Sequence, residues 1–151
     1  MYLTGDKTVK IMLKAIMFLM CLNVYAANDY LAIVSNASAE TTEISQDRLY
    51  SIFLLSARQW DNGVPIIIVM LPEDNLQTQL FVEEYLGISV ASYRRRTSNA
   101  YATGRASKPI VVSSELEALS IVNKTRGGVC YIEGTLYIND ENDNLVRIVI
   151  K

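Results

Sequence analysis

The sequence contains no histidine and only two cysteines, Cys21 and Cys130, among its 151 residues. Without histidine, the chain cannot form a Ser-His-Asp triad, and most types of zinc site are excluded. The sequence also shows no nucleophile with a neighbouring base, no cluster of metal ligands and no glycine-rich nucleotide loop. We therefore expect a protein that is not an enzyme, binds no metal and needs no cofactor.

The first 26 residues have the pattern of a cleavable secretory signal peptide. Three lysines make its start positive: Lys7, Lys10 and Lys14. An apolar stretch at 15–22 follows, and Val24–Ala26 provides suitable residues for signal peptidase. The alternative is an uncleaved membrane anchor, but a membrane-spanning helix needs ~20 apolar residues. We predict cleavage after Ala26, a periplasmic location, and a mature domain over 27–151 without a membrane span.

Positive charge is scarce in the predicted mature chain. The full chain has 14 basic and 16 acidic residues, and the first 26 residues hold three lysines and one aspartate. The mature part is thus left with 11 basic and 15 acidic residues. Nucleic-acid-binding domains carry a basic surface, so we expect no nucleic-acid partner. The remaining cysteine, Cys130, lies in an apolar segment, and we expect a buried thiol.

Segments typical of strands and helices alternate along residues 27–151, with no repeat or linker between them. The predicted strands are 30–34, 65–71, 109–112, 128–133, 136–138 and 145–150. The predicted helices follow capping residues at Ser45, at Asp74 or Asn75, and at Ser114, and a further helix is predicted over 89–102. The alternation predicts one α/β domain, a layered mixed sheet flanked by helices.

Two further expectations concern particular strands. The apolar run at 65–71 suits a strand that is buried on both faces, and we expect it to be the central strand. We also expect 136–138 and 145–150 to pair across the polar turn at 139–144. The single tryptophan, Trp60, is expected to pack against the sheet.

Four segments, taken in chain order, have the pattern of one known protein family. They are Asp47–Phe53, Trp60–Ile66, Tyr101–Arg105 and Gly127–Glu133. This series resembles phosphate-type ABC-transporter substrate-binding proteins, which have the type II periplasmic-binding-protein fold. The resemblance covers residues 30 to about 133. It implies a short, periplasmic-binding-protein-like single lobe that binds phosphate or another small anion.

The chain departs from this family in two ways. Full-size members close two lobes over the ligand, whereas this chain resembles only one lobe. After the strand at 65–71, the family has an arginine and then Ser-Gly-Thr at a helix start. Here Leu71 and Asn75-Leu76-Gln77 take those positions, with Glu73 and Asp74 between them. These two acids stabilise a helix start, but they occupy the positive potential that an anion would need.

The turn at 74–78 is the candidate ligand site by its position in the fold. The residues expected to contact a phosphate-like anion are Asn75, Gln77 and Thr78, together with backbone N–H groups at the helix start. The alternative is an ordinary helix cap in which Asp74 and Gln77 form the capping pair.

The densest basic cluster is Arg94-Arg95-Arg96, with Arg105 and Lys108 farther along the chain. It could hold an anion or an acidic partner, because guanidinium groups bind carboxylate and phosphate well. The alternative is a solvated helix face. Consecutive helical residues point about 100° apart, so the three arginines cannot all converge on one ion.

Three functions follow from the sequence as hypotheses. The first is a periplasmic substrate-binding-like protein for a small, phosphate-like anion. The second is a lobe that no longer binds phosphate and instead docks on an envelope transporter or sensor protein. The third is a sensor half that needs a second copy to complete its cleft.

Overall fold

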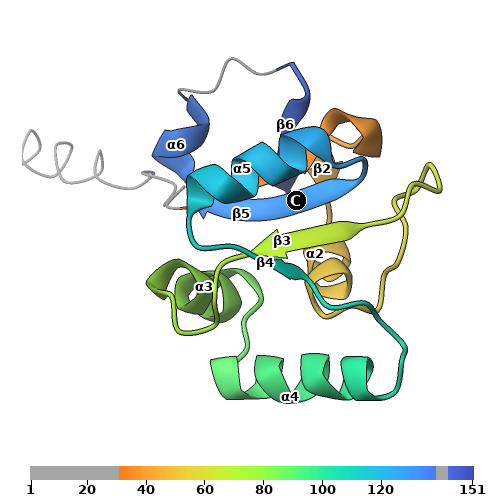
Figure 1. Cartoon of the computed structure of the whole chain (residues 1–151), viewed down its shortest axis with the longest axis vertical. Helices are drawn as coiled ribbons and strands as arrows, with labels where there is room; N and C mark the ends of the chain where they lie inside the picture. The colour runs from red at the N-terminus through yellow and green to blue at the C-terminus, as the bar shows by residue number, and fades with distance from the viewer. Residues whose placement is uncertain (1–30, 139–142) are drawn as a thin grey trace, which may run out of the picture.

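The computed structural model describes residues 31–138 and 143–151, so the predicted signal peptide lies outside the described residues. One six-stranded sheet forms the centre of the molecule, in the order β2-β6-β1-β5-β3-β4 (Figure 1). The strands are β1 (Leu31–Asn36), β2 (Glu43–Ile44), β3 (Ile67–Met70), β4 (Ile110–Val111), β5 (Gly128–Glu133) and β6 (Leu145–Ile150). Strands β3, β4 and β5 run parallel, whereas β1 is antiparallel to both β5 and β6. The predicted α/β class with a mixed sheet is confirmed.

Helices cover both faces of this sheet. They are α2 (Gln46–Phe53), α3 (Leu76–Leu80), α4 (Val90–Ala102), α5 (Glu115–Lys124) and α6 (Gly134–Ile138), with a 3₁₀ turn η1 (Ala37–Ala39). Helix α3 continues into a π-helical turn, η2 (Phe81–Tyr85). In Figure 1, α5 crosses in front of β5, and α2 lies behind β3. Among residues 31–138 and 143–151, no helix is both long enough and apolar enough to cross a membrane.

Serine side chains cap the starts of three helices, two of which, at Ser45 and Ser114, the sequence predicts as caps. The hydroxyls of Ser45, Ser89 and Ser114 each accept a hydrogen bond from the backbone N–H three residues later. Such a bond satisfies one of the N–H groups that a helix start leaves without an intrahelical partner. These local signals explain why the predicted starts of α2, α4 and α5 are correct.

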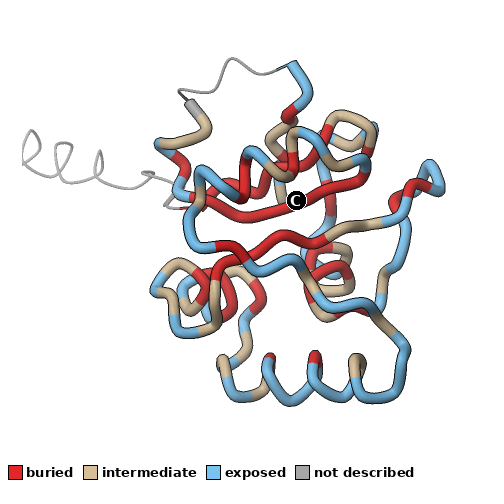
Figure 2. The backbone as a smooth tube through the Cα atoms, viewed as in Figure 1, coloured by how far each residue is buried: buried red, intermediate tan, exposed pale blue. Residues whose placement is uncertain are grey.

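The core lies along β1 and β5: every residue of β1 is buried, and so are residues 128–132 of β5, the buried run that Figure 2 shows across the middle of the molecule. An aromatic cluster holds the helices to this core. The Phe81 ring stacks on the Tyr131 ring with 4.3 Å between centroids, and Phe53 meets Phe81 edge-on at 4.6 Å. Because these residues come from η2, β5 and α2, their packing joins three elements far apart in sequence.

Two predictions about the strands are wrong. Strand β3 is not central, because it lies second from the edge and its outer neighbour β4 has only two residues. Residues 68–70 are buried, but Ile66 and Ile67 are only half-buried. Residues 136–138 belong to α6 and are not a strand. Both edges of β6 are already paired, with β1 and with β2, which leaves no place there for a third strand.

The segment before β3 packs closely against the start of β5 and is hydrogen-bonded to it. The Trp60 side chain is 3% exposed, and its Nε1 donates to the Gly127 carbonyl at 3.0 Å. Gly127 has a φ of 74°, and a Cβ there would lie 2.0 Å from the Pro65 carbonyl oxygen. Only glycine fits this contact. The expected packing of Trp60 is confirmed.

Candidate functional site

The carboxyl ends of β3, β4 and β5 meet at one side of the sheet, which is where α/β folds usually bind ligands. We call this the carboxyl-end edge, and it comprises residues 71–78, 111–117 and 132–134. Hydrogen bonds join its parts: Val112 N donates to the Met70 carbonyl at 3.0 Å. Glu133 N likewise donates to Glu115 Oε1 at 2.6 Å. The three strand ends therefore form one continuous surface.

The three predicted ligand residues lie in one turn of this edge, and two of them are engaged within the protein. Asn75 caps α3, and its Oδ1 accepts from Gln77 N at 2.8 Å. The Thr78 hydroxyl is fully buried, donates to the Leu71 carbonyl at 3.3 Å and shares a 2.6 Å hydrogen bond with the Tyr131 hydroxyl. Gln77 is half-buried. The capping residue is Asn75, and not Asp74.

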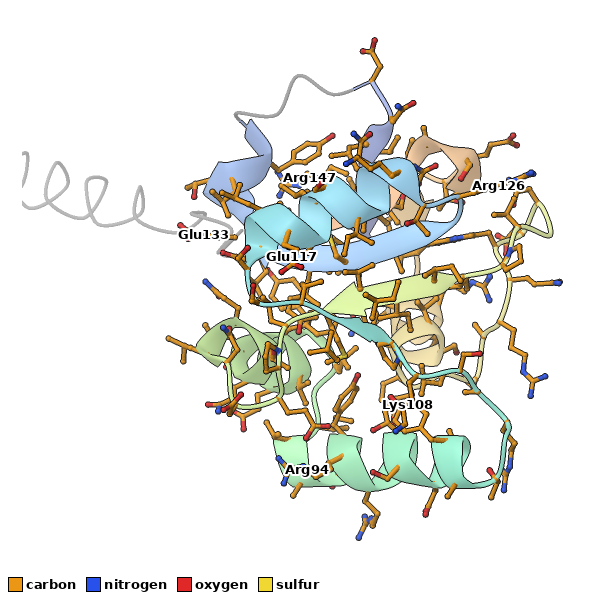
Figure 3. The ribbon with its side chains drawn as sticks, viewed as in Figure 1. Arg94, Lys108, Glu117, Arg126, Glu133 and Arg147 are labelled. Carbon is orange, nitrogen blue, oxygen red and sulfur yellow. The ribbon has the colours of Figure 1, made fainter. Side chains whose placement is uncertain are left out.

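Carboxylates gather along the carboxyl-end edge. They are Glu73, Asp74, Glu115, Glu117 and Glu133, and Figure 3 places Glu117 and Glu133 where β5 ends and α5 begins. The Oε2 of Glu117 accepts from Ser113 N at 2.9 Å and from Ser113 Oγ at 2.8 Å. These hydrogen bonds hold the pKa of the Glu117 carboxyl below its usual value. A carboxylate of the chain thus sits where an anionic ligand would meet the start of α5.

Among the described residues, one basic side chain forms an ion pair with this edge. Arg94 of α4 pairs with Glu73, with 2.5 Å between Nε and Oε2. Arg96 turns away and donates to the Tyr50 hydroxyl at 2.8 Å, and Arg95 is exposed. The three arginines therefore point in different directions, as their helical spacing requires, and only Arg94 is close to the predicted ligand turn.

Two buried groups beside the edge, the Cys130 thiol and the Tyr131 hydroxyl, have raised pKa values. Burial raises the pKa of the Cys130 thiol to about 12, with the Glu115 charge adding to the effect. Burial likewise raises the pKa of Tyr131 to about 12, although its hydrogen bond with Thr78 opposes this shift. A thiol reacts through its thiolate form, so Cys130 is the buried, unreactive residue that the sequence predicts. In the described part of the chain, no group of three or more His, Cys, Asp or Glu side chains could hold a metal ion.

A pocket of about 460 Å³ lies between α4 and the β3–β4 side of the sheet. Tyr93 and Tyr101 of α4 line it, together with Met70, Val111 and Lys108. Its walls are mostly apolar, and Glu73 stands at its rim, so it suits an apolar group better than an anion. The sequence analysis missed these tyrosines, although their spacing of eight residues places both on one face of a helix.

No protein family matches the chain, and no curated protein matches its sequence. Solved structures do match its fold. PstS from Borrelia burgdorferi matches with a TM-score of 0.64 and 14% identity, over 81% of this chain and 47% of that protein. An ABC-type phosphate transport receptor from Vibrio cholerae matches with a TM-score of 0.57 and 19% identity, over 80% of this chain and 45% of the receptor.

A third match comes from Clostridium perfringens, a structure described as a phosphate ABC transporter substrate-binding protein with bound phosphate. Its TM-score is 0.60 at 11% identity, over 80% of this chain and 44% of that one. The chain therefore spans about half the length of the proteins that it matches. At these identities the likeness is one of fold. The chain has the fold of about half of a phosphate-binding protein, as the four sequence motifs imply.

Proposed function

We propose that the chain is an exported, single-lobe relative of phosphate-binding proteins that acts in the cell envelope as a docking module for a transporter or sensor protein. The fold likeness supports the kinship, and the pattern of residues 1–26 supports export. The likeness is to binding proteins, which favours recognition over catalysis. The carboxyl-end edge is the surface that we assign to docking.

One observation carries this proposal: Asn75 and Thr78, two of the three predicted ligand residues, are already hydrogen-bonded within the protein. Asn75 Oδ1 accepts a hydrogen bond from Gln77 N, and the buried Thr78 hydroxyl is hydrogen-bonded to the Tyr131 hydroxyl. At the neighbouring strand end, the Glu117 carboxylate accepts hydrogen bonds from the N–H and the hydroxyl of Ser113. An anion arriving here would meet carboxylates and few free donors.

Exposed apolar side chains on the same edge favour a protein partner. Leu76, the first residue of α3, and Leu116, in the first turn of α5, are each 66% exposed. Val111 at the end of β4 is 60% exposed. Apolar side chains ringed by charged ones are typical of surfaces that bind other proteins. The surrounding carboxylates favour a partner with a basic face.

Binding of a phosphate-like anion is the second candidate. The fold match to a structure with bound phosphate favours it, and its contacts would be Asn75, Gln77 and Thr78 with the N–H groups at the start of α3. Asn75 would have to release the Gln77 N–H first. At an effective dielectric near 20, a carboxylate ~5 Å from the anion opposes binding by a few kcal/mol before screening. Glu73 and Asp74 both lie in this turn.

Calorimetry with inorganic phosphate distinguishes the two candidates. The docking proposal predicts that a Glu73→Gln, Asp74→Asn variant binds phosphate no more tightly than the natural protein. Phosphate binding at the turn predicts that this variant binds more tightly. A Glu83→Gln, Glu84→Gln variant removes the same charge from the exposed face of η2 and serves as the control. Micromolar binding by the natural protein that tightens in the Glu73→Gln, Asp74→Asn variant, but not in the control, would refute the docking proposal.

The export part of the proposal has its own test. Mass spectrometry of the protein from the envelope fraction should find a chain that begins at Ala27, within one residue. Full-length protein in the cytoplasm would contradict export and leave the fold assignment unaffected.

A further inference from the structure

A groove of about 340 Å³ opens at the amino end of β3, whereas the carboxyl-end edge lies at the other end of that strand. Two connections line it, the one that leads from α2 to β3 and the one that leads from α4 to β4. We name it the basic groove after its three cationic side chains, Arg58, Arg105 and Lys108. Figure 3 places Lys108 between β4 and the C-terminal part of α4.

The three cations of the basic groove have no anionic partner among residues 31–138 and 143–151. No carboxylate is among the described residues that line the groove. In the described part of the chain, Arg58, Arg105 and Lys108 form no ion pair within 4.0 Å, whereas Arg48 pairs with Asp61 and Arg94 with Glu73. Like charges that share a groove repel one another, and a bound anion relieves that repulsion.

Apolar side chains also line the basic groove. They include Leu55 and Ile68, which are 8% and 6% exposed, and the half-buried Ile66. An apolar group that packs against these side chains leaves water, and an anionic group attached to it can meet the cations that line the same groove. The volume is at the lower limit of the ~300–1,000 Å³ that small-molecule pockets span. The cationic and apolar side chains of the groove therefore favour a small anion with an attached apolar group.

The backbone that carries the cations is fixed before any ligand arrives. Ile66 N donates to the Arg58 carbonyl at 2.9 Å, and Arg105 N donates to the Ala100 carbonyl at 3.0 Å. Gly104, with a φ of 65°, makes the sharp turn that ends α4 and directs Arg105 toward the groove. A fixed backbone lowers the entropic cost of binding.

We propose that the basic groove is a binding site for a small organic anion, a carboxylate or phosphate monoester on a short aliphatic or aromatic body. Arginine is suited to this role because its planar guanidinium binds either anion with two parallel hydrogen bonds. The site lies at the opposite end of β3 from the predicted ligand turn, and it is independent of the docking function proposed above.

Calorimetry on protein purified after expression of the full-length gene tests this site. The probes are phenyl phosphate and hexanoate, which separate the phosphate-ester and carboxylate forms of the ligand. Phenol and inorganic phosphate supply the apolar body and the charge alone, and each should bind at least about tenfold more weakly than phenyl phosphate. Equal binding of inorganic phosphate, or no binding of either probe at millimolar concentration, would overturn the proposal.

Charge-matched variants locate the binding. An Arg58→Ser, Arg105→Ser variant should lose about tenfold or more in affinity for the tighter probe, and Lys108→Gln should lose a smaller factor. An Arg95→Ser, Lys124→Ser variant removes the same charge elsewhere on the surface and should change affinity by less than about twofold. Equal losses in both double variants would indicate general attraction and overturn the site. The Glu73→Gln, Asp74→Asn variant should bind the probe unchanged, which separates this outcome from that of the proposed function.

Discussion

The two ends of strand β3 differ in charge and in how their polar groups are used. At the carboxyl end, five carboxylates line the carboxyl-end edge, and Asn75, Thr78 and Glu117 are hydrogen-bonded within the protein. At the amino end, three cations surround the basic groove without an ion-pair partner in the described residues. At the end where this kind of fold usually binds ligands, two of the three predicted ligand residues are therefore engaged, whereas the opposite end has charged groups available.

The two ends are also stabilised by different contacts. Close backbone packing holds the amino end, where Gly127 touches Pro65 and its carbonyl accepts the Trp60 side chain. A buried hydroxyl pair, Thr78 with Tyr131, holds the carboxyl end. Packing of this tightness leaves no space for an added atom, whereas a hydrogen bond can be removed with little change in shape. Substitutions at the two ends should therefore lower the free energy of unfolding by different amounts.

The largest effect is expected for Gly127→Ala at the amino end. The new methyl group would overlap the Pro65 carbonyl oxygen, and the φ of 74° is itself strained for alanine. We expect a loss of about 3 kcal/mol in the free energy of unfolding, measured by urea denaturation. Gly63→Ala is the matched control, because Gly63 has a φ of 82° but nothing within 4 Å of the added Cβ. It should lose only about 1 kcal/mol, and an equal loss in both variants would contradict the packing argument.

The next effect is expected for Thr78→Val at the carboxyl end. Valine keeps the shape of threonine but leaves the buried Tyr131 hydroxyl without this partner, which should cost about 1–3 kcal/mol. Adding Tyr131→Phe removes both hydroxyls and should recover part of that loss. Urea denaturation of the two single variants and the double variant gives the coupling energy. A coupling energy near zero would show that the hydroxyl pair does not stabilise this end.

A third effect depends on pH and involves Cys130, which precedes Tyr131 on β5. Its folded pKa of about 12 is above the ordinary value of 9.0. The unfolded chain therefore loses the thiol proton first, and stability falls as the pH rises above 9. One such group should cost about 1.4 kcal/mol at pH 10 relative to pH 7. Denaturation of Cys130→Ala should show a flatter profile between pH 9 and 10, and an unchanged slope would contradict this assignment.

Local sequence signals predict the helix starts correctly, because a capping serine acts within three residues of its own position. They predict the strand order less well. The apolar run at 65–71 indicates burial, but the number of neighbours on each side of β3 depends on partners elsewhere in the chain. A short apolar segment such as 136–138 suits a strand or a helix, and β6 decides the outcome because β1 and β2 already occupy both of its edges.

The candidate sites show the same limit. Position in the fold predicts correctly that Asn75 lies at the helix start after β3, and its capping role also follows from local chemistry. The bond between Thr78 and Tyr131 joins residues 53 positions apart, so no local pattern reveals that Thr78 is occupied. The basic groove combines Arg58 and Arg105 from separate connections. Only the folded arrangement of β3 and β4 brings them together.

The smallest effect is expected at the ion pair between Glu73 and Arg94, the one basic contact on the carboxyl-end edge within the described residues. Both side chains are well exposed, at 36% and 62%, so solvent screens their attraction. We expect Arg94→Gln to change the free energy of unfolding by less than about 1 kcal/mol, and Arg95→Gln, its charge-matched control, to change it even less.

The pair matters more for surface charge, because its loss would leave five uncompensated carboxylates at this edge. A docking partner with a basic face should then bind the Arg94→Gln variant more tightly than the natural protein at low salt. The Arg95→Gln control should show a smaller increase in affinity. Urea denaturation measures the change in stability, and binding to a partner isolated from the cell envelope, at several salt concentrations, measures the change in docking. A stability loss above about 2 kcal/mol would mean that the pair is structural.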